Sequence, residues 1–115
     1  MLRDRLLDLL EWAREKGLLV EHSSSELQFK ITPVITVYPT GKLYVRFGKG
    51  NESKLPKLRR QKLLEELQKL KMLSPEIKDA DSVEDGRQTL RGIHELSEEE
   101  FRHLKELFEE LFLQT

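Results

Sequence analysis

One stretch of the chain, residues 38–46, combines tyrosines and basic residues at alternate positions. Alternate side chains of an extended strand point to the same face of a sheet, so this polar set shares one surface. Aromatic rings on an exposed sheet can stack on bases, while cations beside them neutralise phosphates. The sequence therefore predicts a nucleic-acid-binding face formed by Tyr38, Lys42, Tyr44 and Arg46. The preceding stretch adds Lys30 to this face.

The basic residues continue beyond this stretch and make the charge distribution strongly asymmetric. Residues 42–72 carry ten basic side chains against three acidic ones, a net charge of +7, whereas residues 73–115 carry five against twelve, a net charge of −7. Such a block of charge is an argument about partners and not about fold. Basic residues of the helix expected here would extend the candidate surface along a DNA or RNA backbone: Lys57, Arg59, Arg60 and Lys62.

Two other interpretations of these patterns stay open. Tyrosine and threonine are favoured on exposed strands by propensity alone, and the acidic third of the chain could neutralise the basic third within the fold. A purely structural role would then be sufficient to explain both the aromatic residues and the charge pattern. The end of the chain also carries more apolar residues than one helical stripe needs, which suggests a protein-binding or homo-oligomer surface formed by Phe108, Leu111, Phe112 and Leu113.

The sequence contains no signal for catalysis, metal binding or cofactor binding. There is no cysteine, which excludes thiolate chemistry, and His22, His94 and His103 lack metal-ligand spacing. The strands expected at residues 34–38 and 43–47 contain no carboxylate of the kind that a magnesium-dependent nuclease needs. We therefore expect a non-catalytic binding module with no metal and no cofactor.

Length and composition suit one small globular domain over residues 1–115. A chain of 115 residues with 37% hydrophobic residues can bury one core. No apolar run reaches the roughly 20 residues that span a bilayer, and the N-terminus lacks a signal-peptide pattern. From these features we expect a cytoplasmic protein without membrane contact.

Hydrophobic periodicity predicts three helices. Leucines at three- and four-residue spacing predict a helix over residues 2–16, ended by Gly17. The same spacing predicts a helix over residues 56–71. Ser97 followed by Glu100 matches a capping box, which predicts the start of the terminal helix.

Between the first two helices the hydrophobic period changes to two, which is typical of strands. A short strand candidate at residues 18–21 precedes longer stretches at 27–32, 34–38 and 43–47. The tight loop between the last two suits a type I turn with Gly41 in a left-handed conformation.

This turn fixes the register of the hairpin. It pairs Val37 with Leu43 and Ile35 with Val45, so that all four point to one face. The expected fold class is therefore α+β, an antiparallel three-stranded meander with helices on one face, in the order αβββαα. Residues 48–54 and 76–92 lack a periodic pattern and are expected to be irregular loops.

The arrangement resembles a small uncharacterised bacterial α+β module. The resemblance covers most of the chain and rests on residues 10–13 (Leu-Glu-Trp-Ala) with Gly17 after them, and on the hairpin at residues 35–47. Some modules of this kind accompany nuclease-like proteins, which implies an accessory role near DNA.

Overall fold

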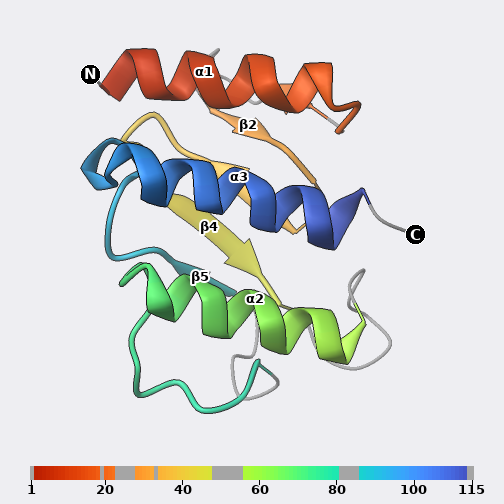
Figure 1. Ribbon diagram of the computed structural model, residues 1–115, viewed down its shortest axis with the longest axis vertical. Coiled ribbons are helices and arrows are strands. Elements are labelled where there is room, and N and C mark those ends of the chain that lie inside the picture. Colours follow the sequence, from red (N-terminus) through yellow and green to blue (C-terminus); the bar gives the residue numbers. More distant parts are fainter. Residues whose placement is uncertain are drawn as a thin grey trace.

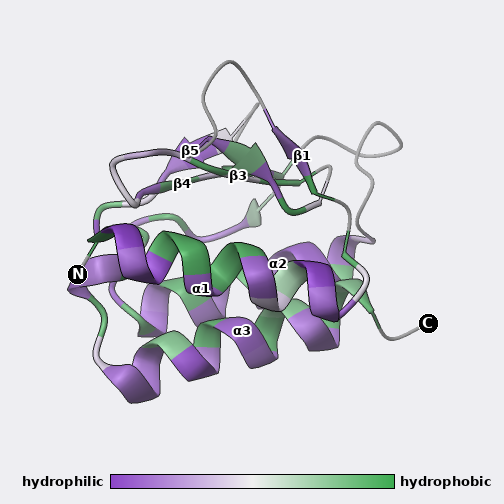
Figure 2. Ribbon diagram, turned by 90° about the horizontal axis from the view of Figure 1, so that it is seen from above, coloured by the Kyte–Doolittle hydropathy of each residue, from purple (hydrophilic) through white to green (hydrophobic). Residues whose placement is uncertain are grey.

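The computed structural model describes residues 2–18, 20–22, 28–32, 34–47, 56–80 and 86–113. Its elements in chain order are α1 (Leu2–Glu15), β1 (Glu21–His22), β2 (Phe29–Lys30), β3 (Ile35–Val37), β4 (Leu43–Arg46), α2 (Lys57–Lys69), β5 (Gly86–Gln88), the short 3-10 helix η3 (Ile93–Glu95) and α3 (Glu98–Phe112). They form two layers, with the α-helices side by side against one face of an antiparallel sheet (Figure 1, Figure 2). The expected α+β class with helices on one face is confirmed.

The predicted three-stranded meander is wrong in its extent, because the described part of the sheet has five strands in the order β1-β2-β3-β4-β5. The additional strand β5 lies inside residues 76–92, which the sequence analysis expected to be an irregular loop. Its residues show little apolar alternation because β5 is an edge strand with exposed Arg87 and Gln88. Backbone pairing with β4 holds it in place, and that pairing leaves no pattern in the sequence.

The β3–β4 hairpin has the predicted register, with Val37 opposite Leu43 and Ile35 opposite Val45. Its turn is closed by the Gly41 N–H, which donates to the Tyr38 carbonyl at 2.9 Å. Gly41 has a φ of 89°, a conformation that favours glycine. A side chain there would also collide with His94, whose Nδ1 would lie 2.7 Å from an added Cβ.

The hydrophobic core lies between the two layers. Inward-facing residues of β2, β3 and β4 are fully buried, and leucines and phenylalanines of the helices pack against them (Figure 2). The strand residues are Phe29, Ile35, Val37, Leu43 and Val45, and the helix residues include Leu6, Leu9, Leu63, Leu67, Leu104 and Phe108. Burying one such side chain contributes on the order of 1.5–3 kcal/mol relative to leaving it exposed. This one-sided burial leaves the opposite face of the sheet to polar residues.

Local signals define the helix ends largely as the sequence predicts. Gly17 follows α1 with a φ of 79°, as expected of a C-terminal cap. At the start of α3 the Ser97 hydroxyl accepts a hydrogen bond from the Glu100 N–H at 3.1 Å. The Ser97 N–H in turn donates to the Glu100 carboxylate at 2.9 Å, which completes the predicted capping box.

The predicted loop at residues 48–54 lies outside the described residues. Within the stretches that the structure does describe, no helix has both the length and the apolar character needed to cross a lipid bilayer.

We expect Ser97→Ala to lower the free energy of unfolding by about 1 kcal/mol, because two N–H groups at the start of α3 depend on the capping box. Urea denaturation monitored by circular dichroism measures the change. Ser97→Asp is the matched control, since aspartate also caps helices, and it should retain most of the stability. Equal destabilisation by both substitutions would contradict a capping role.

Candidate nucleic-acid interface

One row of side chains crosses the outer face of the sheet, with one residue from each strand. The residues stand directly opposite one another in neighbouring strands, so their side chains share a face. In strand order they are Glu21, Lys30, Thr36, Tyr44 and Gln88. The pairing of Thr36 with Tyr44 follows from the predicted hairpin register, and the sequence analysis also placed Lys30 on this face.

Two more of the predicted residues lie at the hairpin end of the same face. The Tyr38 N–H donates to the Lys42 carbonyl at 3.0 Å, which places these residues opposite each other one step beyond Thr36 and Tyr44. Both side chains are half-buried. Tyr38, Lys42 and Tyr44 therefore belong to one continuous surface, as the alternation predicted.

The ring of Tyr44 is held in place by its neighbours. It lies over Gly86 of β5, where an added Cβ would be 2.9 Å from Tyr44 Cε1 and 2.4 Å from the Val45 carbonyl oxygen. The Arg46 guanidinium carbon lies 5.7 Å from the centroid of the same ring, within the range of a cation–π interaction. Tyr44 thus has a packing role in the sheet in addition to any contact with a ligand.

The cations of the outer face lack acidic partners in the described parts of the chain. Lys30, Lys42 and Arg46 have no carboxylate oxygen within the 4.0 Å of an ion pair there. Glu21 is the carboxylate nearest in register, directly across from Lys30 at the β1 edge. Among the residues that the structure describes, the outer face therefore carries more cations than carboxylates.

The basic residues of α2 have a different environment, because α2 belongs to the helical layer on the opposite side of the sheet (Figure 2). Arg59 donates from Nη1 to the Leu111 carbonyl of α3 at 3.0 Å, and Lys62 forms an ion pair with Glu110. Arg60 is only 3% exposed. Lys57 is exposed at the first turn of α2. The structure does not bring these four residues together with the outer face of the sheet.

The apolar residues proposed for a protein-binding surface on α3 belong mostly to the core. Phe108 and Leu111 are buried, and Phe112 and Leu113 are half-buried against the core. The ring centroid of Phe112 lies 6.0 Å from that of Phe108. Little of this apolar set is therefore available on the surface.

Sequence reasoning missed two members of the outer face, Gln88 and Glu21. Gln88 was missed because β5 carries no strand signal, and Glu21 because β1 is two residues long and exposed. Only the pairing of β5 with β4 and of β1 with β2 places them beside Tyr44 and Lys30.

Several carboxylates of the helical layer are paired with cations. Glu66 of α2 lies 3.2 Å from His103 Nε2 of α3 and 3.4 Å from Lys69 Nζ. Burial raises the pKa of Glu66, but hydrogen bonds and charges from His103 and Lys69 outweigh it and hold the pKa below the usual 4.5. No group of three or more potential metal ligands occurs among the residues that the structure describes.

Comparisons with protein-family models, with curated proteins and with solved structures gave no significant match. The function is therefore argued from the geometry of this chain.

We expect Arg59→Gln to lower the free energy of unfolding by about 1 kcal/mol, because its guanidinium binds a carbonyl at the negative end of the α3 dipole. Lys30→Gln is the matched control on the outer face and should change stability by less than about 0.5 kcal/mol. Chemical denaturation of both variants tests whether the two groups of cations differ in role. A larger loss of stability in Lys30→Gln than in Arg59→Gln would contradict the view that Arg59 stabilises the fold and Lys30 does not.

The acid sensitivity of the fold should depend on Glu66 and Glu100. Hydrogen bonds from the Ser97 N–H and, to a smaller extent, from Arg91 hold the pKa of Glu100 below 4.5. His103 and Lys69 likewise hold the pKa of Glu66 below 4.5. Groups with a lowered pKa stabilise the fold above their unfolded pKa, and this contribution is lost as the pH falls through the folded pKa.

We therefore expect the thermal midpoint to fall as the pH drops below 4.5. A Glu66→Gln/Glu100→Gln double variant should be less stable than the wild type at pH 7 and should show a shallower decline in acid. The thermal midpoints of both proteins are measured by calorimetry from pH 7 to pH 3. If the midpoints fall in parallel as the pH drops, these carboxylates do not control acid stability.

Proposed function

We propose that the protein is a non-catalytic nucleic-acid-binding module whose outer sheet face contacts the phosphate backbone without strong sequence preference. Lys30, Lys42 and Arg46 would neutralise phosphates, while the rings of Tyr38 and Tyr44 would contact bases or sugars. The basic residues of α2 are left out of this interface, because α2 lies in the helical layer on the other side of the sheet, where Arg59 and Lys62 contact α3.

The observation that carries this proposal is that three cations share the outer face of the sheet and no carboxylate of the described residues pairs with them, whereas several cations of the helical layer are paired. In the helical layer, ion pairs join Lys16 to Glu109, Lys62 to Glu110 and Lys105 to Asp8. On the outer face the three cations have no carboxylate at ion-pair distance within the described ranges. A cation without an internal partner remains able to neutralise an external anion.

The aromatic residues give the second line of support. Tyr44 stands between Thr36 and Gln88 in the row across the sheet, and the Arg46 guanidinium lies over its ring. Stacking of a base on an aromatic ring contributes about 1–3 kcal/mol and tolerates any base, because every base has a π face. This suits binding with weak sequence preference, and single-stranded DNA or RNA exposes its bases for such stacking.

The alternative, a protein-binding or dimerisation surface on α3, has less support. Only Phe112 and Leu113 of its four proposed residues are more than marginally exposed. Arg59 also donates a hydrogen bond to the carbonyl of Leu111 near the end of this helix.

We expect the triple variant Lys30→Ala/Lys42→Ala/Arg46→Ala to weaken binding of labelled oligodeoxythymidine or oligouridine at least roughly tenfold at low salt. The slope of log K against log salt should become less negative by about 2, because three phosphate contacts to a single strand are lost. Fluorescence anisotropy at several salt concentrations measures both quantities.

The matched control is Lys69→Ala/Lys71→Ala/Lys78→Ala, which removes the same charge from the α2 side of the molecule. It should leave affinity and salt slope close to those of the wild type. Equal losses in both triple variants would indicate a general charge effect and contradict a defined interface. Absence of binding by the wild type in low salt would refute the proposal itself.

A further inference from the structure

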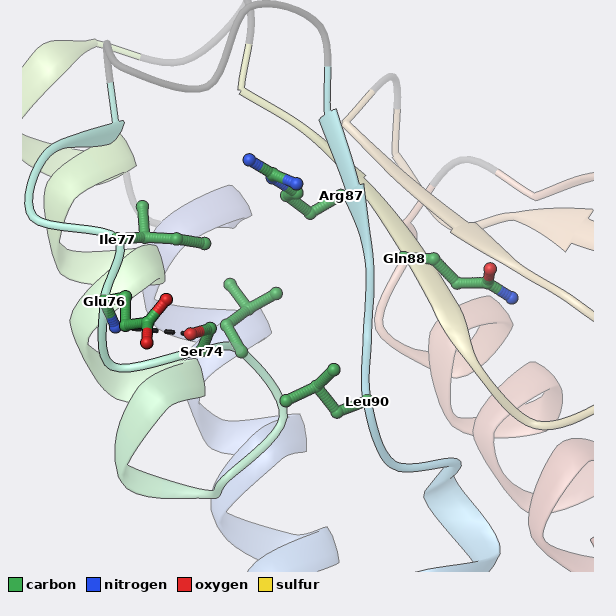
Figure 3. A pocket seen from close by; sticks show the side chains of 7 residues that line it. Ser74, Glu76, Ile77, Arg87, Gln88 and Leu90 are labelled. Atoms are coloured by element: carbon green, nitrogen blue, oxygen red, sulfur yellow. Dashed lines mark hydrogen bonds between the residues drawn. The ribbon is translucent and has the colours of Figure 1, made fainter.

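One member of the outer face, Gln88, has a neutral side chain that can both donate and accept hydrogen bonds. It stands directly opposite Tyr44 in the pairing of β4 with β5, and it is exposed. Figure 3 shows it pointing away from the pocket that Ile77 and Arg87 line. The amide of Gln88 is therefore presented to solvent on the same face as the ring of Tyr44.

Other glutamines of this chain use their amides within the fold. Gln61 accepts a hydrogen bond from the Ala80 N–H at 3.0 Å. Gln68 donates to two carbonyl groups of the loop after α2, at 2.8 and 2.7 Å. The Gln88 side chain forms no hydrogen bond in the parts of the chain that the structure describes. Its donor and acceptor groups therefore remain available to a ligand.

The ring of Tyr44 extends from β4 toward β5. A Cβ added at Gly86 would lie 2.9 Å from Tyr44 Cε1 and 3.1 Å from Cζ, so the outer edge of the ring lies over the backbone of β5. Arg46, opposite Gly86, and Gln88, opposite Tyr44, are both exposed. Residues in direct register have Cβ atoms about 4.5–5.5 Å apart. A base that contacts this ring therefore lies within reach of the Gln88 amide.

An amide places a hydrogen-bond acceptor beside a donor. The Watson–Crick edge of each nucleobase offers the same combination: N6–H and N1 in adenine, N4–H and N3 in cytosine, O6 and N1–H in guanine, and O4 and N3–H in thymine or uracil. One amide can thus form a pair of hydrogen bonds with any base whose Watson–Crick edge is unpaired. In a duplex the complementary strand occupies these groups.

We infer that Gln88 is a base-contacting residue that makes the outer face selective for single-stranded over double-stranded nucleic acid, whatever the sequence. This inference rests on the proposed function, because Lys30, Lys42 and Arg46 supply the backbone contacts that bring a strand to the face. The amide of Gln88 then distinguishes unpaired bases from paired ones without distinguishing one base from another.

The shape of the face also favours a single strand. A duplex exposes base edges only in its grooves, and the major groove of B-form DNA admits an α-helix or a two-stranded ribbon. Gln88 lies on a sheet with five strands among the described residues. Such a sheet is broader than a two-stranded ribbon, so a duplex meets this face mainly through its phosphates.

The test compares labelled oligodeoxythymidine with the same strand made from N3-methylthymidine. Methylation removes the N3–H donor and blocks the Watson–Crick edge, whereas the ring for stacking and the phosphates remain. We expect the wild-type protein to bind the unmodified strand roughly fivefold more tightly, measured by fluorescence anisotropy at low salt. It should also bind this strand more tightly than a duplex of oligodeoxythymidine with oligodeoxyadenosine, and a duplex bound as tightly overturns the inference.

Gln88→Met keeps the length of the side chain and removes its hydrogen-bonding groups. It should bind the unmodified strand roughly fivefold more weakly than the wild type does and bind the methylated strand equally well. A loss of stability would weaken binding of both strands, so the ratio of the two affinities reports the base contact alone. A ratio that Gln88→Met leaves unchanged overturns the inference.

Arg87→Met is the matched control, because Arg87 lies on the other face of the same strand (Figure 3). It should retain the wild-type ratio of affinities for the two strands. Loss of the ratio in this variant would show that any change in β5 has the same effect, and would contradict a specific role of Gln88.

The inference and the proposed function fail in different ways. Equal and salt-dependent binding of both strands by the wild type leaves the backbone contacts in place and overturns the role of Gln88. Absence of binding to either strand at low salt overturns both.

Discussion

The one-sided burial of the sheet is the constraint on which the rest of this structure depends. Side chains of a strand alternate between faces, so each inward residue of β3 and β4 fixes an outward neighbour. Ile35, Val37 and Leu43 are completely buried under the helices. A shift of one residue in the pairing of these strands would exchange the two faces, at the cost of burying Tyr44 and Lys42 and exposing the core. The composition of the outer face is therefore a consequence of the packing of the inner one.

The charge asymmetry of the sequence is divided between two surfaces with different roles. Part of the positive block lies on α2 and meets the acidic residues of α3, as the ion pair between Lys62 and Glu110 shows. This part acts within the fold, in agreement with the interpretation that the acidic third neutralises the basic third. Lys42 and Arg46 of the same block lie on the outer face of the sheet, away from α3 (Figure 2). A net charge of −1 for the whole chain thus coexists with a local cationic surface.

The edge strand β5 links the sheet to two different surfaces. Gly86 allows the ring of Tyr44 to lie against the backbone of β5, which stabilises the outer face near this edge of the sheet. On its other edge the same strand directs the main-chain groups of Gly86 and Gln88 away from β4. Edge strands commonly carry charged residues that prevent unwanted pairing, and Arg87 is exposed on β5.

Local patterns were sufficient for the β3–β4 hairpin and the ends of the helices, because alternation, Gly41 and the Ser97 capping box act between residues close in the sequence. They also placed Tyr38, Lys42 and Tyr44 on one face. The positions of β5, of Gln88 beside Tyr44 and of Arg59 against α3 could not be predicted in this way. These contacts join residues tens of positions apart through backbone pairing and burial. Many different sequences can form such pairing or such burial, so neither leaves a recognisable local pattern. Only the tertiary structure therefore decided which cations serve the fold and which remain available to a ligand.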